Sequence, residues 1–165
     1  MRNYLVVAAD GARTRFFKLV PAEFPELESG PNLVELEDLV NPEIDEKGRE
    51  LWSDLKTGRG KAPGEGPAHG YDDHRDRHRD EIERRFARLT GEEIINRTTR
   101  QKVDVLIVAA ESRMLGMLRD TFEKKLPAET RLTERAEDLS KLDSLELHAH
   151  LAKEGLLPPR KPPQG

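Results

Sequence analysis

The stretch Leu5-Val6-Val7-Ala8-Ala9-Asp10-Gly11-Ala12-Arg13-Thr14-Arg15-Phe16-Phe17-Lys18-Leu19 decides the fold. It consists of an apolar run, an Asp-Gly pair and a second run in which basic and apolar residues alternate. An Asp-Gly pair tolerates the positive φ values of a tight two-residue turn, and such runs on either side of it are typical of paired strands. The stretch therefore predicts a β-hairpin.

The next segments extend this hairpin and then change to helix. Residues 21–31 contain three prolines and a glycine, which favours a surface loop, and residues 33–40 predict a third strand. Residues 57–71 contain five glycines and two prolines, so we expect a mobile loop. Residues 73–101 predict a long helix, because their apolar side chains recur near helical spacing among many charges.

The last third of the chain alternates strands and helices. Residues 103–110 are almost entirely apolar, which predicts a strand buried on both faces. Ser112 is placed to cap a helix that ends before Pro127, and residues 129–136 predict a polar edge strand. The sequence Asp143-Ser144-Leu145-Glu146 is a capping box that predicts a final helix.

The order of these elements predicts an α/β fold. Three strands form an antiparallel meander, and helix-strand-helix-strand-helix follows; right-handed crossovers then give a mixed five-stranded sheet of ribonuclease H-like topology. We expect one domain over residues 1–155, with the mobile loop at 57–71. Residues 156–165 contain four prolines and predict a disordered tail.

Composition excludes several classes of protein. The 165 residues carry a net charge of -4, which argues against a surface that binds nucleic acid as a whole, although a local basic patch is compatible with it. The absence of cysteine excludes disulfides, thiolate zinc sites and cysteine nucleophiles. No segment approaches the roughly 20 apolar residues that cross a bilayer. We therefore expect a cytoplasmic protein with no membrane partner.

Four blocks of sequence resemble a known family. The blocks are residues 9–17, 34–42, 106–119 and 137–151, and their order and spacing are similar to those of the bacterial host-attachment protein family. That family looks like a relative of the middle domain of archaeal and eukaryotic peptide-chain release factors and of the Pelota ribosome-rescue protein. The resemblance implies the same fold and an association with the ribosome.

The glycine-rich loop departs from the release-factor pattern. Those factors carry a glycine-glycine-glutamine tip on the loop before the long helix, whereas this chain reads Pro63-Gly64-Glu65-Gly66-Pro67. The departure argues against hydrolysis of peptidyl-tRNA. Arg59 and Lys61 of the loop are suited to contact phosphates. We therefore expect a non-enzymatic protein that binds the ribosome or a structured RNA through Arg59, Lys61, Gly64 and Gly66; a protein partner recognised by the loop or the tail is the other option.

The alternative function is that of a metal-dependent phosphodiester hydrolase, similar to a nuclease. Asp10 and Glu111 follow strands that the predicted topology makes neighbours, and carboxylates at such positions hold Mg²⁺ in ribonuclease H-like nucleases. The simpler interpretation makes Asp10 a hairpin residue and Glu111 the residue before a helix cap. No cofactor is expected apart from such a divalent ion.

Two further patterns carry candidate chemistry. His69, His74 and His78 lie near the start of the long helix, where His74 and His78, four residues apart, could share a metal ion; interspersed arginines would repel that cation. Arg13 and Arg15 form a basic stripe beside two phenylalanines, which suits an RNA-facing surface. The competing interpretation pairs these arginines with Glu35 and Glu37 of the third strand.

Overall fold

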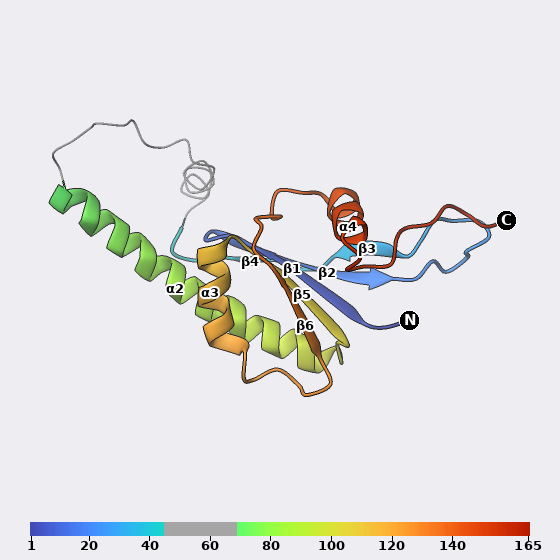
Figure 1. Cartoon of the computed structure of the whole chain (residues 1–165), viewed down its shortest axis with the longest axis horizontal. Helices are drawn as coiled ribbons and strands as arrows, with labels where there is room; N and C mark the ends of the chain where they lie inside the picture. The colour runs from blue at the N-terminus through green and yellow to red at the C-terminus, as the bar shows by residue number, and fades with distance from the viewer. Residues whose placement is uncertain (45–68) are drawn as a thin grey trace.

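The computed structural model describes residues 1–44 and 69–165, and of residues 69–74 the backbone alone (Figure 1). Its strands are β1 (Tyr4–Ala9), β2 (Arg13–Val20), β3 (Asn32–Glu35), β4 (Leu39–Val40), β5 (Val105–Ala109) and β6 (Arg131–Arg135). Its helices are α2 (His69–Arg100), α3 (Ser112–Phe122) and α4 (Ser144–Lys153). None of these helices is both long enough and apolar enough to cross a membrane.

The strands form one mixed sheet in the order β3-β2-β1-β5-β6, with β4 also paired to β2. β1 pairs antiparallel with β2 and parallel with β5, and β5 pairs parallel with β6. The prediction of a mixed α/β fold is confirmed. The prediction of five strands is wrong, because residues 36–38 are not part of a strand and the predicted third strand becomes β3 and β4.

The first turn closes differently from the prediction. The Asp10 amide donates to the Arg13 carbonyl at 2.9 Å, so Gly11 and Ala12 are the two central residues of the turn. Among the described residues, positive φ values occur at Lys102 and Gly155 and not at Gly11. The turn is held by the carboxylate of Asp10 and needs no left-handed residue.

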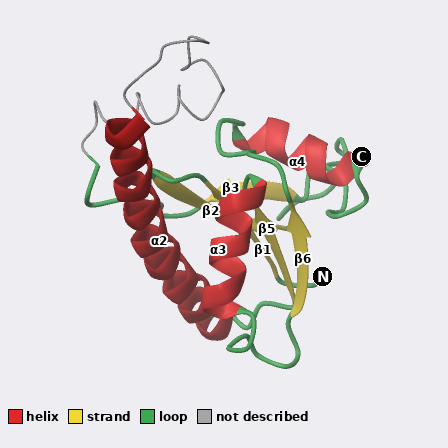
Figure 2. Cartoon of the chain, turned by 60° about the vertical axis from the view of Figure 1, so that its left-hand side comes forward, coloured by secondary structure: helices red, strands yellow, loops and turns green. Residues whose placement is uncertain are grey.

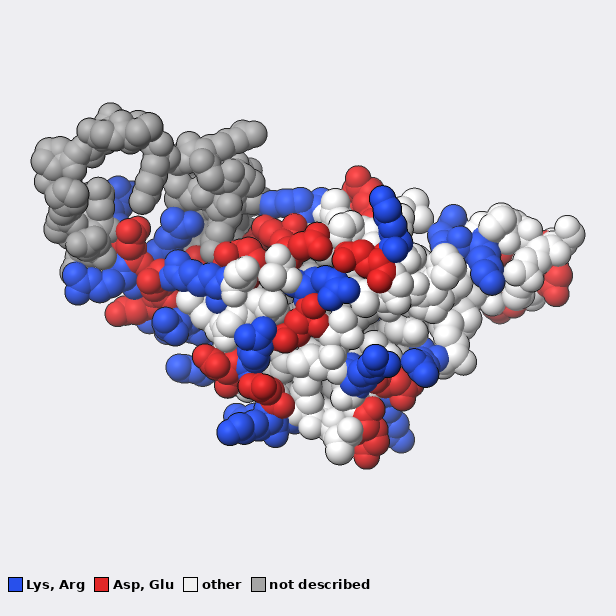
Figure 3. Space-filling view, viewed as in Figure 1, with Lys and Arg blue, Asp and Glu red and all other residues white. Residues whose placement is uncertain are grey.

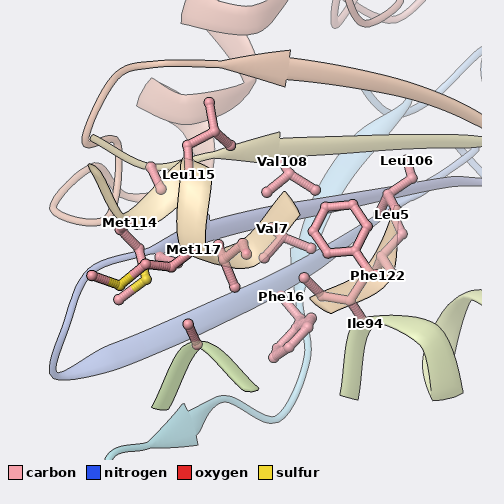
Figure 4. Packing of buried hydrophobic residues seen from close by; sticks show 14 of the residues in the cluster. Leu5, Val7, Phe16, Ile94, Leu106, Val108, Met114, Leu115, Met117 and Phe122 are labelled. Atoms are coloured by element: carbon pink, nitrogen blue, oxygen red, sulfur yellow. The ribbon is translucent and has the colours of Figure 1, made fainter. Parts of the chain in front are cut away.

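Helices cover both faces of the sheet, α2 and α3 on one and α4 on the other (Figure 2). Side chains of β1 and β5 alternate between the two resulting cores, because successive strand residues point to opposite faces. Figure 4 shows the first core, in which Val7, Leu106 and Phe122 pack together. The second core contains Val6, Ile107 and Leu147 among its members.

The long helix α2 begins at His69, four residues before the predicted start, and its amino end extends beyond the sheet (Figure 1). Phe86 and Ile94 anchor it in the first core, and a hydrogen bond of 2.9 Å joins the hydroxyls of Thr90 and Thr14. A Cβ at Gly91 would lie 1.8 Å from Thr121 Oγ1 of α3. Gly91 is therefore the residue that lets the two helices approach closely.

The final helix starts as predicted. Asp143 accepts from the amide of Glu146, and Glu146 accepts from the amide of Asp143, which confirms the capping box. The predicted edge strand is β6, which is two residues shorter at its amino end than expected. The residues between β6 and α4, 136–143, run from one edge of the sheet to the face that α4 covers.

The tail differs from the prediction of disorder. Leu157 is 4% exposed and belongs to the second core. Lys161 exchanges two backbone hydrogen bonds with Gly30, of 3.0 and 2.9 Å, and Gln164 donates to the Pro25 carbonyl. Prolines lack an amide hydrogen, so the non-proline residues between them supply the donors that fix the segment.

Candidate functional site

Polar side chains gather where β1 ends and β2 begins. We call this group, which consists of Asp10, Arg15, Glu35, Asp138 and Ser140, the Asp10–Ser140 network. Its members come from three segments: the first turn with β2, the strand β3, and the residues between β6 and α4. Asp10, Arg15 and Ser140 are each less than a tenth exposed. Buried polar groups need partners, and the network supplies them.

Arg15 is the centre of the network. Its Nε and Nη2 donate to the two carboxylate oxygens of Glu35, each at 2.8 Å, and its Nη1 donates to the carbonyls of Ser140 and Leu142. Its guanidinium also lies 4.9 Å from the centre of the Phe17 ring. The hydrogen bond from Arg15 lowers the pKa of Glu35, against a smaller opposing effect of burial. The bidentate pair therefore joins β2 to β3. The Nη1 hydrogen bonds join β2 to the segment before α4.

Asp10 is engaged on both of its oxygens. Oδ1 accepts from the amides of Ala12 and Arg13 at 2.7 and 2.8 Å, and Oδ2 lies 3.2 Å from the Ser140 hydroxyl. That hydroxyl is closer to Asp138 Oδ1, at 2.5 Å, and it carries a single proton. Asp10 therefore acts as the hairpin residue, which agrees with the simpler sequence interpretation.

Glu111 serves as a helix cap. It is the N-cap of α3, and its Oε1 accepts from the Met114 amide at 2.8 Å. The prediction that Ser112 caps this helix is wrong by one residue, because the longer carboxylate of Glu111 reaches the same amide position. Within the described residues, Asp10 and Glu111 belong to no group of three metal-ligating side chains whose donor atoms lie together. The hydrolase alternative finds no support in this geometry.

The basic stripe of β2 is neutralised by acids. Arg13 contacts Asp38 at 2.5 Å and Glu35 at 3.8 Å, and Arg15 is bound to Glu35, so the competing interpretation holds with Asp38 in place of Glu37. Phe16 and Phe17 are both fully buried and offer no stacking platform. Figure 3 shows that blue and red side chains are interspersed over the described part of the face that this view presents.

The remaining predicted residues fall into two groups. Arg59, Lys61, Gly64 and Gly66, with most of the predicted loop 57–71, lie outside the described residues. His69 and His74 lie on the first turns of α2, where the backbone alone is described, and His78 is exposed on the same helix.

Sequence reasoning missed Ser140 and Asp138. A usable signal was the spacing Asp-x-Ser, because an Asp side chain often accepts from the amide two residues on, as Asp138 does from Ser140 at 3.0 Å. The pairing of Arg15 with Glu35 was one of the two sequence interpretations, and the structure shows that it is bidentate, with both carboxylate oxygens engaged.

Fold and site define the class: an α/β protein with a mixed sheet whose strand-end carboxylates hydrogen-bond backbone amides. A family described as "Protein required for attachment to host cells" matches residues 5–151. The chain belongs to this family, as the four sequence blocks predicted. Among curated proteins, none matches the chain.

Proposed function

We propose that this member of the host-attachment family is a binding protein that acts without catalysis. The observation that carries the proposal is the engagement of its strand-end carboxylates. Asp10 Oδ1 accepts from two turn amides, Asp10 Oδ2 lies beside the Ser140 hydroxyl, and Glu111 caps α3. A general base or a metal ligand directs an oxygen lone pair at the substrate or the ion, whereas Asp10 Oδ1 and Glu111 Oε1 accept from backbone amides.

The partner we propose is the ribosome or another structured RNA. Support comes from the sequence of loop 57–71, in which Arg59 and Lys61 flank glycines, and from the resemblance to the release-factor middle domain and Pelota, with their ribonuclease H-like topology. Arg13 and Arg15 fit this role less well than the sequence suggested, because Glu35 and Asp38 already bind them. The tail is poorly suited to be a free ligand, since its backbone is paired to Gly30 and Pro25.

Co-sedimentation with ribosomes tests the proposal. The full chain is compared with the double variant Arg59→Glu, Lys61→Glu over salt concentrations from about 50 to 200 mM. We expect pelleting that weakens with salt, and a salt slope that falls by about two in the variant, one for each lost phosphate contact. A double variant at exposed positions elsewhere, Lys124→Glu with Lys125→Glu, makes the same charge change and serves as the control.

Three results would contradict the proposal in different ways. If the wild type does not pellet at the lowest salt, the ribosomal partner is wrong. If the protein cleaves a phosphodiester in the presence of Mg²⁺, and Asp10→Asn abolishes the cleavage, the absence of catalysis is wrong. Pelleting that both double variants lose equally would place the contact outside the loop.

A further inference from the structure

Three metal-ligating side chains meet on the α4 side of the molecule, outside the network described above. We call Glu137, His150 and Glu154 the His150 cluster. Glu137 follows β6, whereas His150 lies on the last turn of α4 and Glu154 is its C-cap residue. The His150 Nε2 atom is 3.1 Å from Glu137 Oε2 and 2.9 Å from Glu154 Oε1. One donor atom from each residue lies within 4.8 Å of the other two.

The His150 cluster has one possible hydrogen-bond donor for two carboxylate acceptors. A single imidazole nitrogen faces two carboxylate oxygens, and it carries at most one hydrogen. If the ring donates its hydrogen to one of the two carboxylates, no hydrogen remains between the nitrogen and the other carboxylate. A metal ion between the three atoms would accept a lone pair from each, because ligation needs a deprotonated nitrogen and ionised carboxylates.

Arg135 orients a carboxylate of the cluster, in the way that neighbouring hydrogen-bonding groups orient metal ligands in proteins. Arg135 Nε donates to Glu154 Oε2 at 3.1 Å, which leaves Oε1 of the same carboxylate directed at His150. Arg135 is itself fixed, since its Nη1 donates to the Glu134 carbonyl at 3.0 Å. Hydrogen bonds of this kind to a ligating carboxylate are usual in metal sites. The carboxyl end of α4 adds the negative end of a helix dipole, which attracts cations.

The donor set selects the kind of ion. One imidazole nitrogen and two carboxylate oxygens suit Zn²⁺ and neighbouring divalent transition metals, whereas Mg²⁺ and Ca²⁺ prefer oxygen ligands alone. The pair His150 and Glu154, four residues apart at the end of one helix, presents both donors on the same side. The three side chains are 30–42% exposed, so water can complete a tetrahedral shell.

We propose that Glu137, His150 and Glu154 bind a divalent transition-metal ion, Zn²⁺ by the chemistry of the donors, and that the ion joins the segment after β6 to the end of α4. Its role is structural. It would fasten residues 136–143, which also carry Asp138 and Ser140 of the Asp10–Ser140 network, to the helix that follows them.

Calorimetric titration of the chelator-treated full chain with ZnCl₂ tests the proposal, together with thermal unfolding with and without the ion. We expect one site of roughly micromolar Kd and a rise in Tm of about 5–10 °C at a hundredfold excess over Kd. His150→Ala and Glu137→Gln should each weaken binding at least roughly tenfold and abolish the rise in Tm. MgCl₂ in place of ZnCl₂ should leave the Tm unchanged.

The histidines of α2 supply the matched control, because the sequence predicts a competing metal site there. The triple variant His69→Ala, His74→Ala, His78→Ala should bind Zn²⁺ as the wild type does. The proposal is overturned if the wild type shows no micromolar site, or if binding survives His150→Ala and disappears in the triple variant. Thermal unfolding without metal establishes that each variant is folded; Glu137 lies outside the helix, so its variant leaves α4 intact.

Discussion

Two neighbouring residues, Glu137 and Asp138, send their side chains into different environments. Asp138 accepts from the hydroxyl and the amide of Ser140 within the largely buried Asp10–Ser140 network. Glu137 approaches His150 in a cluster that remains about a third exposed. The carboxylates of the network accept from backbone amides and from the Arg15 guanidinium, whereas in the cluster two carboxylates share one imidazole nitrogen. The comparison teaches that the first group stabilises the fold, whereas the second is the group that we propose to bind a metal ion.

Removal of the Arg15 side chain should lower the free energy of unfolding more than any other substitution in the network or the His150 cluster. Arg15→Ala leaves the Glu35 carboxylate and two carbonyls, those of Ser140 and Leu142, without their donor. We expect the free energy of unfolding to fall by about 2–4 kcal/mol, measured by urea denaturation. Arg13→Ala is the control: its side chain is 47% exposed, and we expect a loss below about 1 kcal/mol. Equal losses in the two variants would contradict the special role of Arg15.

Asp10→Ala should have the next largest effect. The change removes the acceptor of two turn amides, those of Ala12 and Arg13, in a buried position. We expect a loss of about 1–2 kcal/mol by the same measurement. Asp10→Asn retains an oxygen for the amides, so its loss should be less than half as large. An Asn variant as unstable as the Ala variant would show that the negative charge, not the acceptor geometry, holds the turn.

Acid should weaken the network through Glu35. Because Arg15 lowers the pKa of Glu35 in the folded protein, the pair contributes stability above the ordinary value of 4.5 and loses it as pH falls through the folded value. Glu35→Gln should therefore lower stability at pH 7 and show a shallower decline below about pH 4.5. Since Glu35 is partly exposed, we expect the difference to stay below about 1 kcal/mol. Parallel pH curves for wild type and variant would contradict this linkage.

The smallest effect is expected in the His150 cluster without metal. Glu137→Gln removes a charge from a half-exposed contact, and we expect the free energy of unfolding to change by less than about 0.5 kcal/mol in chelator. The same variant loses the stabilisation by Zn²⁺. A large loss already in chelator would mean that the cluster is a structural ion pair, and the contrast with the network would disappear.

The sequence predicted those parts of the fold that depend on local patterns. The apolar runs of β1 and β5, and the capping box at Asp143, carry their structure in adjacent residues, and all three are confirmed. The split of the third strand was not predictable, because β3 and β4 each pair with a different part of β2 and such pairing is not encoded locally. Residues with two local uses, such as Asp10, could be assigned only once their partners were placed.

The two polar groups were less predictable than the strands, for a physical reason. Arg15 meets the carbonyls of Ser140 and Leu142 across more than a hundred residues of chain, and no local pattern encodes such a contact. Within the His150 cluster, the spacing of His150 and Glu154 on one helix was visible, whereas the approach of Glu137 depends on where β6 ends.

The packed tail lies beyond the residues that the family match covers. The family match stops at residue 151, yet Leu157 belongs to the second core and Lys161 forms an isolated antiparallel bridge with Gly30. A boundary drawn from the family match would therefore omit Leu157, a buried member of the second core. The tail therefore contributes to the core of the protein, although the family match does not include it.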